Sequence, residues 1–460
     1  MNAQLAFLIA YSAALIALGL WIGRYVRGAA DFFVASRRLP AFLLFSTLLA
    51  ANIGAGSTVG AALLGYQQGL GAWWWNGSAG IGSLLLAFWI GPRIWRVARE
   101  HDFLTLGDFL EHRFGRTVRG FVGLVLWLVT PFILAAQIIG VATILEAVAG
   151  LSRATGATAG VVVMLVYFVA GGLLGSAWVN MVQLVVLMTG FLVATPLAVA
   201  AAGGLEALST APHLPADFAT FWRGQASLGL MALLVPAFVI SPGLIQKTYG
   251  ALDERAIRLG IGASGIVLLF FAFLPPLVGM SARVLYPDLE NVNMALPVML
   301  ADQLPPLVGS LALAAVLSAE VSSADAVLFM LSTSLSQDLY RRFVRPAAGD
   351  REVLRVARIG AVIGGVAGLM LALVLPTVVD ALKVFYSVLT VMLFVPVVAA
   401  LYSRRIGFPE AIVSVSAGLV VMTSVALTTG GDAVASTVAG LAAAAAALGA
   451  VAFVRALTRD

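Results

Sequence analysis

The sequence predicts an all-α polytopic membrane protein with about thirteen transmembrane helices. Two observations predict this class. Of the 460 residues, 61% are hydrophobic and only 11% are charged, and the mean hydropathy is +1.02. Apolar stretches of about 20 residues, long enough to cross a ~30 Å hydrocarbon layer, recur along the whole chain. A soluble enzyme, a disordered protein and a nucleic-acid-binding module are excluded, because each needs more charged surface.

The predicted spans are separated by arginine clusters or by turn residues. They cover residues 5–26, 41–66, 72–93, 120–149, 155–177, 179–203, 226–246, 259–285, 304–336, 356–377, 379–402, 407–429 and 434–454. The first span is longer than the core of a signal peptide and has no basic residue before it, so we expect it to be retained. No loop is long enough for a separate soluble domain, so residues 1–460 are predicted to form a single transmembrane domain.

The basic residues predict the orientation of these spans. If the N-terminus is outside, all but four of the 27 lysines and arginines fall in inside loops, among them Lys247. The four exceptions are Arg153, Arg223, Arg283 and Lys383. Such a bias predicts a multi-pass protein of the cytoplasmic membrane with its N-terminus outside and its C-terminus inside.

Two predicted spans are interrupted by residues that break helices. The second contains glycines and small polar residues from Asn52 to Gly60, and the seventh contains Ser241-Pro242-Gly243. The seventh span comes five spans after the second. This offset is expected if residues 41–203 and 226–402 form two inverted repeats of five spans each. Paired interruptions of this kind indicate a substrate site near the membrane midplane. The alternative is that the glycines only allow close helix packing.

The ninth span carries a polar stripe. Ser322 and Ser323 share one helix face, and Asp325 lies at its edge. Hydroxyl and carboxylate oxygens are hard ligands that suit an alkali cation, and carbonyls released near Ala50 and Ile53 could complete the set. The alternative is that each serine only bonds a carbonyl one turn back in its own helix.

Other chemistry is not indicated by the sequence. Glu320 points about 200° away from Ser322, so we expect it to have a different role. There are no cysteines, no zinc-ligand spacing, no nucleophile elbow and no Walker loop. All three histidines fall in predicted loops. We therefore expect a protein that is not an enzyme.

Four stretches resemble the sodium/solute symporter family, which includes sodium-coupled glucose, proline and pantothenate transporters. Residues 31–40 (DFFVASRRLP) resemble the loop after the family's first helix, and residues 50–55 (AANIGA) resemble the unwound part of its first core helix. Residues 171–183 (GGL to WVNMVQ) are similar to its GG…W-T-D-x-x-Q segment. Residues 322–340 (SS to QDLY) resemble its cation-binding helix.

The resemblance implies a LeuT-type core of five plus five helices. It also implies an extra N-terminal helix and cytoplasmic loop over residues 5–40 and two extra C-terminal helices over residues 403–460. The sodium site that it implies is made by the carbonyls of Ala50, Ile53 and Ala319 and the hydroxyls of Ser322 and Ser323. Sodium is then the coupling ion, and no organic cofactor is expected.

The chain departs from the family at Asn180, where many members have an aspartate near the sodium path. Asp325 could compensate, because some members contribute a second sodium ligand from that position. Asp325, Asn180 and Glu320 are therefore candidates for a second cation site or for coupling.

The substrate site is expected between the two broken spans. Its candidate residues are Asn52, Ser57, Trp75, Asn76, Gln137, Phe238, Ser241 and Tyr386. The competing interpretation of Trp75 is that the Trp73-Trp74-Trp75 run anchors in lipid headgroups. No arginine clamp for a dicarboxylate is visible, which favours a neutral, zwitterionic or monocarboxylate solute.

We therefore predict sodium-coupled symport of a small organic solute into the cell by alternating access. The alternatives are proton-coupled symport through Asp325 or Glu320, and a membrane solute receptor that does not transport. The expected partners are the small-molecule substrate and membrane lipid, without nucleic acid.

Overall fold

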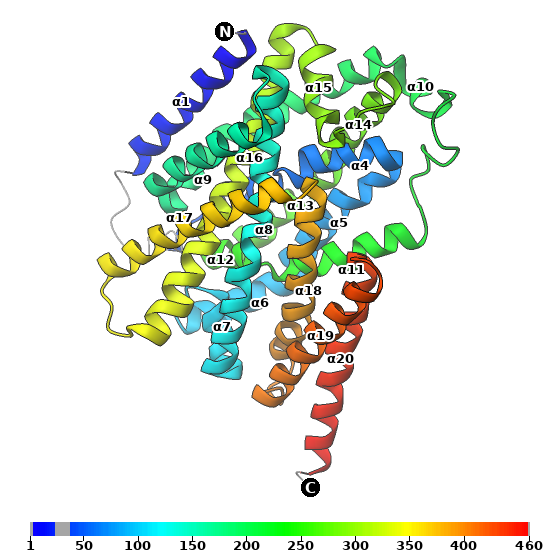
Figure 1. Ribbon diagram of the computed structural model, residues 1–460. Helices are drawn as coiled ribbons and strands as arrows, with labels where there is room; N and C mark the ends of the chain where they lie inside the picture. Colours follow the sequence, from blue (N-terminus) through cyan, green and yellow to red (C-terminus); the bar gives the residue numbers. More distant parts are fainter. Residues whose placement is uncertain (1–2, 24–36, 459–460) are drawn as a thin grey trace.

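The computed structural model describes residues 3–23 and 37–458, and these residues form an all-helical bundle (Figure 1). The elements, in chain order, are α1 (Ala3–Gly23), α3 (Ala41–Asn52), η2 (Gly56–Gly60), α4 (Ala61–Gln68), η3 (Gly69–Ala72), α5 (Trp73–Leu85), η4 (Leu86–Ile90), α6 (Gly91–Glu100), α7 (Leu106–Phe114), α8 (Arg116–Ala149), α9 (Arg153–Ala201), α10 (Gly204–Thr210), α11 (Gln225–Ile240), α12 (Pro242–Tyr249), α13 (Glu254–Phe271), α14 (Leu274–Leu285), η5 (Val292–Met294), α15 (Ala295–Asp302), α16 (Pro306–Thr333), η6 (Ser334–Val344), α17 (Asp350–Val374), α18 (Val378–Tyr402), α19 (Phe408–Thr428) and α20 (Ala433–Leu457).

These helices follow the predicted apolar stretches. Within the described residues, nine helices are long and apolar enough to cross a membrane, or ten if one bent pair is counted as a single span. The larger number, about thirteen, stays a prediction. Where the sequence predicted two spans, at 155–177 and 179–203, the structure has the single helix α9. Its two outer parts, Arg153–Val166 and Val179–Ala201, are separately apolar.

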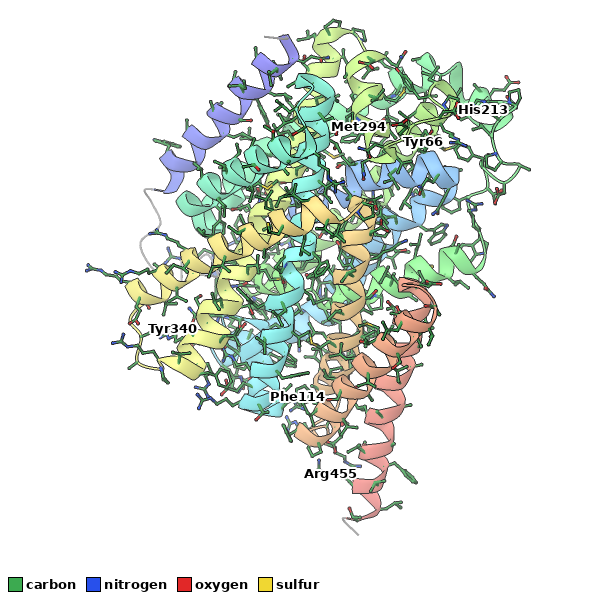
Figure 2. The ribbon with its side chains drawn as sticks, viewed as in Figure 1. Tyr66, Phe114, His213, Met294, Tyr340 and Arg455 are labelled. Atoms are coloured by element: carbon green, nitrogen blue, oxygen red, sulfur yellow. The ribbon has the colours of Figure 1, made fainter. Side chains whose placement is uncertain are left out.

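The core of the bundle is built around α16. Most of its side chains are buried, and it packs against α8, α9, α17 and α3. Outside this core, α1 lies against α9 and α16, while α19 and α20 form a hairpin beside α18. The described chain begins at one end of the molecule and finishes at the opposite end (Figure 1). Figure 2 shows Tyr66 and His213 near the first of these ends, and Arg455 near the second.

Both predicted interruptions are breaks in the helices. The axis bends by 62° between α3 and the helical segment that starts at Gly56. The second break separates α11 from α12 at Ser241, whose extended backbone (φ −55°, ψ 124°) precedes Pro242. Proline lacks the N–H that would continue the helical ladder, which explains the interruption at this position.

Some parts of the sequence motifs lie outside the described residues. These are residues 31–36 of the first motif and, for their side chains, residues 171–178 of the third. The structure also contains three short helices that were not predicted, namely α7, α10 and α15.

Candidate functional site

The first break is held open by side chains. Gln137 of α8 accepts a hydrogen bond from the Ala55 amide at 2.8 Å. The Ser57 hydroxyl donates to the Asn52 carbonyl, also at 2.8 Å. Because buried backbone groups must be paired when the helical ladder is interrupted, these contacts fix the position and shape of the break.

Several oxygens gather where the end of α3 meets the middle of α16. The Ser322 hydroxyl lies 3.2 Å from the Ala50 carbonyl and 3.1 Å from the Ala319 carbonyl. The Ser323 hydroxyl lies 3.2 Å from the Ala50 carbonyl and 3.1 Å from the Ile53 carbonyl. The structure thus brings together the five residues that the sequence analysis named for sodium.

This cluster is suited to one kind of ligand. Its five oxygens are neutral carbonyls and hydroxyls, and the residues that provide them are largely buried. Hard, uncharged oxygen donors fit an alkali cation better than a soft transition metal. Two of the carbonyls, those of Ala50 and Ile53, are near the end of α3, where the helical ladder stops. An ion bound there would connect α3 to α16.

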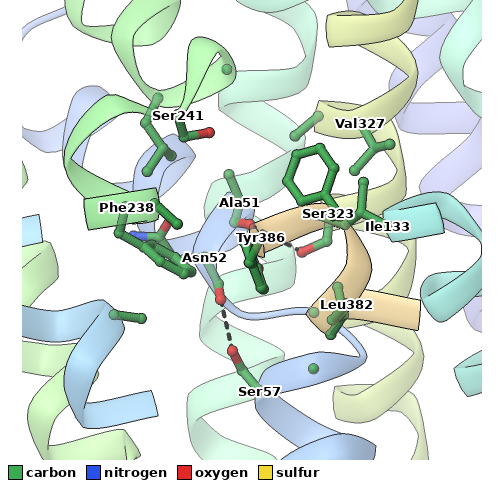
Figure 3. Close-up of a pocket in the computed structure, with 18 of the residues that line it drawn as sticks. Ala51, Asn52, Ser57, Ile133, Phe238, Ser241, Ser323, Val327, Leu382 and Tyr386 are labelled. Atoms are coloured by element: carbon green, nitrogen blue, oxygen red, sulfur yellow. Dashed lines mark hydrogen bonds between the residues drawn. The ribbon is translucent and has the colours of Figure 1, made fainter. Parts of the chain in front are cut away.

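A cavity lies beside this cluster, between the two broken helices (Figure 3). The space in it that the centre of a water molecule can occupy is about 70 Å³. All eight residues predicted for the substrate site line this cavity, namely Asn52, Ser57, Trp75, Asn76, Gln137, Phe238, Ser241 and Tyr386. Ser323 also lines it, so the oxygen cluster and the cavity share a wall.

The polar groups of the cavity are partly engaged with the protein itself. The Asn52 amide nitrogen donates to the Ser83 hydroxyl at 3.1 Å, and the Asn76 amide nitrogen donates to the Ser57 carbonyl at 2.9 Å. The Asn52 side-chain oxygen is buried and has no hydrogen-bond partner within the described structure. It is therefore available to a donor group on a ligand.

Aromatic rings form another part of the wall. The Tyr386 ring lies 5.5 Å from the Phe238 ring and 6.4 Å from the Trp75 ring, measured between centroids. Trp75 is only 3% exposed and lines the cavity, so it does not anchor in lipid headgroups. Trp73 and Trp74 instead donate to backbone carbonyls and pack against Phe221.

The two acidic residues of the polar stripe lie in different surroundings. Glu320 is fully buried and accepts a hydrogen bond from the Thr58 hydroxyl at 2.9 Å. A Cβ atom added at Gly140 would lie 2.8 Å from its other oxygen, so the carboxyl group packs tightly against α8. Asp325 is 7% exposed and interacts electrostatically with Lys247. Asn180 is buried in α9, which packs against α16.

Lys247 is the functional candidate that the sequence analysis missed. It was assigned to an inside loop, and this assignment is wrong because the residue lies in α12, is 2% exposed and lines the cavity. The available signal was its position one residue beyond the predicted span 226–246 and one helical turn after Gly243. Its burial depends on neighbouring helices that are distant in sequence.

Comparison with known proteins gives matches over most of the chain. The family model described as the sodium:solute symporter family matches residues 32–418. A sodium/glucose cotransporter of Vibrio parahaemolyticus is 24% identical over 79% of this chain and 73% of its own length. A sodium/pantothenate symporter of Escherichia coli K12 is 29% identical over 75% of this chain and 72% of its own length.

Solved structures with the same fold are also transporters. A sodium-coupled sialic acid symporter in a substrate-bound, outward-open state has a TM-score of 0.82 at 18% identity. The match covers 98% of this chain and 97% of that one. Mhp1, a nucleobase-cation-symport-1 family transporter in a closed conformation, has a TM-score of 0.59 at 14% identity. The match covers 91% of this chain and 92% of Mhp1.

Proposed function

Because the chain belongs to the sodium:solute symporter family, we propose that it carries a small organic solute across the membrane by alternating access, driven by sodium. The expectation of a membrane transporter rather than an enzyme is confirmed by the family and its relatives. The observation that supports the proposal most directly is the oxygen cluster at Ser322 and Ser323, which adjoins the cavity.

In this proposal the coupling ion is bound by the carbonyls of Ala50, Ile53 and Ala319 and the hydroxyls of Ser322 and Ser323. Sodium binding then favours the conformation in which α3 and α16 touch. An ion can shift such an equilibrium only by the difference in its affinity for the two states. Since the ligands come from two helices, separating these helices dismantles the site, which provides that difference.

The solute is proposed to bind in the cavity between the two breaks. Among the described residues that line it, Lys247 is the single charged side chain, and the rest offer amides, hydroxyls and apolar surface. Such a wall suits a small solute that is neutral, zwitterionic or a monocarboxylate. A solute with several negative charges would lack matching basic groups.

The proposed topology has thirteen spans, with an inverted-repeat core, one helix before it and two after it. The N-terminus is outside and the C-terminus is inside the cytoplasmic membrane. The described chain begins at one end of the molecule and finishes at the opposite end (Figure 1). This arrangement supports an odd number of membrane crossings.

The test of the sodium site is Ser323→Ala, measured by binding of ²²Na⁺ to purified protein with potassium as the competing-ion control. Loss of one ligand to a charged group costs about 1.5–3 kcal/mol, so we expect sodium affinity to fall about tenfold or more. Ser310→Ala is the matched control, because its hydroxyl lies on the same helix and donates to the Pro306 carbonyl at 2.7 Å. Unchanged sodium affinity in Ser323→Ala would reject the site. Solute uptake driven by a pH gradient without sodium would instead favour proton coupling.

A further inference from the structure

One face of α16 and η6 lines three cavities in succession. The first, named here the central cavity, lies between the two breaks, and the second, the inner cavity, lies between α7, α8, α12 and α16. The third is lined by arginines of α8 and η6 and is named the arginine cavity. The residues of α16 and η6 that line the cavities recur every three or four positions, which keeps them on one helix face. In chain order they include Ser323, Val327, Met330, Ser334, Asp338 and Arg342.

The same three cavities are also lined in order by α8, which packs against α16 and η6. Gln137 and Ile133 line the central cavity. Leu126 and Gly123 line the inner cavity, and Arg119 lines the arginine cavity. These positions also follow the spacing of one helix face. The cavities therefore follow one another along two packed helices, from the oxygen cluster to the end of the bundle that carries the arginines of η6.

Single residues separate the inner cavity from its two neighbours. Among the described residues, Met330 is the one that lines both the central and the inner cavity. Arg119 is likewise the one that lines both the inner and the arginine cavity. The space that the centre of a water molecule can occupy is about 20 Å³ in the inner cavity and about 440 Å³ in the arginine cavity. The inner cavity thus has room for about one water molecule, and an organic solute cannot pass it in this conformation.

Met330 is the more mobile of these two residues by its chemistry. Arg119 is held by ion pairs with Asp108 at 2.7 Å and with Asp338 at 2.8 Å. Methionine has an unbranched, apolar side chain with three rotatable bonds, which adapts to spaces of different shape. The Met330 sulfur faces the start of α12, because a Cβ atom at Gly243 would lie 4.0 Å from it. A change of rotamer at Met330 therefore breaks no ion pair.

We propose that Met330 is the partition that the solute must pass between the central cavity and the inner cavity on its way to the arginine cavity. This inference rests on the proposed function, since it assumes that the solute binds in the central cavity. Passage then requires displacement of the Met330 side chain, followed by separation of Arg119 from its carboxylate partners. Met330 is seven residues after Ser323, about two helical turns along the same face. The proposed sodium site and the partition therefore belong to one helix.

The test uses single cysteines as reporters, because the chain has none of its own. Ala326→Cys reports on the central cavity and Thr333→Cys on the inner cavity. The probe is sulfonatoethyl methanethiosulfonate, a thiol reagent that does not cross membranes, applied to inside-out vesicles. A minor open state is populated at about 10% or less, so permanent opening by Met330→Ala should raise the labelling rate of Ala326→Cys about tenfold or more. The labelling rate of Thr333→Cys should not change, because this residue lies beyond the partition.

Matched substitutions serve as controls. Met330→Leu conserves the side-chain volume and should label as wild type does. Met392→Ala removes another buried methionine, in α18, that lines none of the three cavities, and it should also leave the rate unchanged. Equal labelling of Ala326→Cys with and without Met330→Ala would overturn the proposal. Faster labelling of both reporters would also overturn it, because it would show a general loosening of the bundle. If Met330→Ala does not fold, Met330→Val provides the same comparison with a smaller loss of volume.

Failure of the proposed function would give a different result. Gly349→Cys, at an exposed position between η6 and α17, verifies that this end of the molecule faces the reagent. Sodium, with potassium as the control, should slow the labelling of Ala326→Cys, because the proposed ion at Ser323 holds α3 against α16. A rate that does not respond to sodium would count against the sodium site. The comparison of Met330→Ala with wild type would still decide the role of Met330.

Discussion

Among the residues that the structure describes, Arg119 forms the most ion pairs. Its guanidinium lies 2.7 Å from Asp108, 3.0 Å from Glu111 and 2.8 Å from Asp338. Glu111 is also paired with Arg342. These contacts join α7, α8 and η6. Removing one partner would leave a poorly compensated charge, so the network stabilises the packing of these three elements.

The pKa of Glu111 gives a test of this network. Burial alone would raise the pKa of this carboxyl, but its hydrogen bonds with Arg342 and Arg119 lower it below the ordinary value of 4.5. A lowered folded-state pKa means that the stabilisation is complete above the ordinary value and is lost as pH falls through the lowered one. We expect Glu111→Gln to reduce the thermal stability of the detergent-solubilised protein at neutral pH. The difference from wild type should shrink in acid, and a constant difference at all pH values would contradict the assignment.

At the scale of the elements, the two breaks differ in how closely they are packed. The break after α3 faces Ser323 and Gln137, and no side chain fits at Gly54 without meeting them. The break before α12 is more open, because a Cβ atom at Gly243 would meet only the Met330 sulfur, at 4.0 Å. The first break therefore depends on glycine for space, whereas the second depends on Pro242.

This difference predicts that two matched variants behave differently, with loss of sodium affinity in one and no change in the other. In Gly54→Ala the new methyl group would collide with the Ser323 side chain and lie 2.7 Å from the Gln137 side-chain oxygen. Making room for it would displace the Ser323 hydroxyl, one of the proposed ligands, and loss of a contact to a charged group costs about 1.5–3 kcal/mol. We therefore expect sodium affinity to fall roughly tenfold or more. Gly243→Ala should bind sodium as wild type does. Equal ²²Na⁺ affinities for the two variants would show that the proposed site does not depend on this close approach.

At the scale of the whole molecule, the charges and the helix order together suggest an orientation. α10 lies at the same end of the bundle as the start of α1, and the connection between η6 and α17 lies at the opposite side (Figure 1). Arginines cluster on both sides of that connection, at Arg341, Arg342, Arg345, Arg351 and Arg355, as expected of a segment inside the cell. The proposed orientation therefore places α10 outside.

The absence of cysteine from the sequence makes this orientation easy to test. Ser209→Cys in α10 and Gly349→Cys before α17 each introduce one thiol at an exposed position. A membrane-impermeant maleimide should label Ser209→Cys in intact cells and Gly349→Cys only after permeabilisation. The reverse pattern would show an inverted protein, and labelling of both in intact cells would refute the predicted number of crossings between them.

The sequence by itself determined the features that arise from local composition. Apolar stretches predicted the helical membrane class, and Pro242 and the glycines near Gly54 predicted where helices break. The spacing of Ser322 and Ser323 predicted a shared polar face. These predictions work because the membrane imposes the same requirement on every segment, namely apolar side chains and a paired backbone.

Only the tertiary structure decided what depends on neighbours that are distant along the chain. It showed one helix, α9, that begins at Arg153 and ends at Ala201 where two spans were predicted, and it turned Trp75 into the cavity and away from lipid. It also buried Lys247, whose ammonium donates to the Thr47 carbonyl, although the sequence had placed this lysine in a loop. Hydropathy reports the cost of burying a charge. The partner that compensates this cost comes from another helix, so only the packing of the helices identifies that partner.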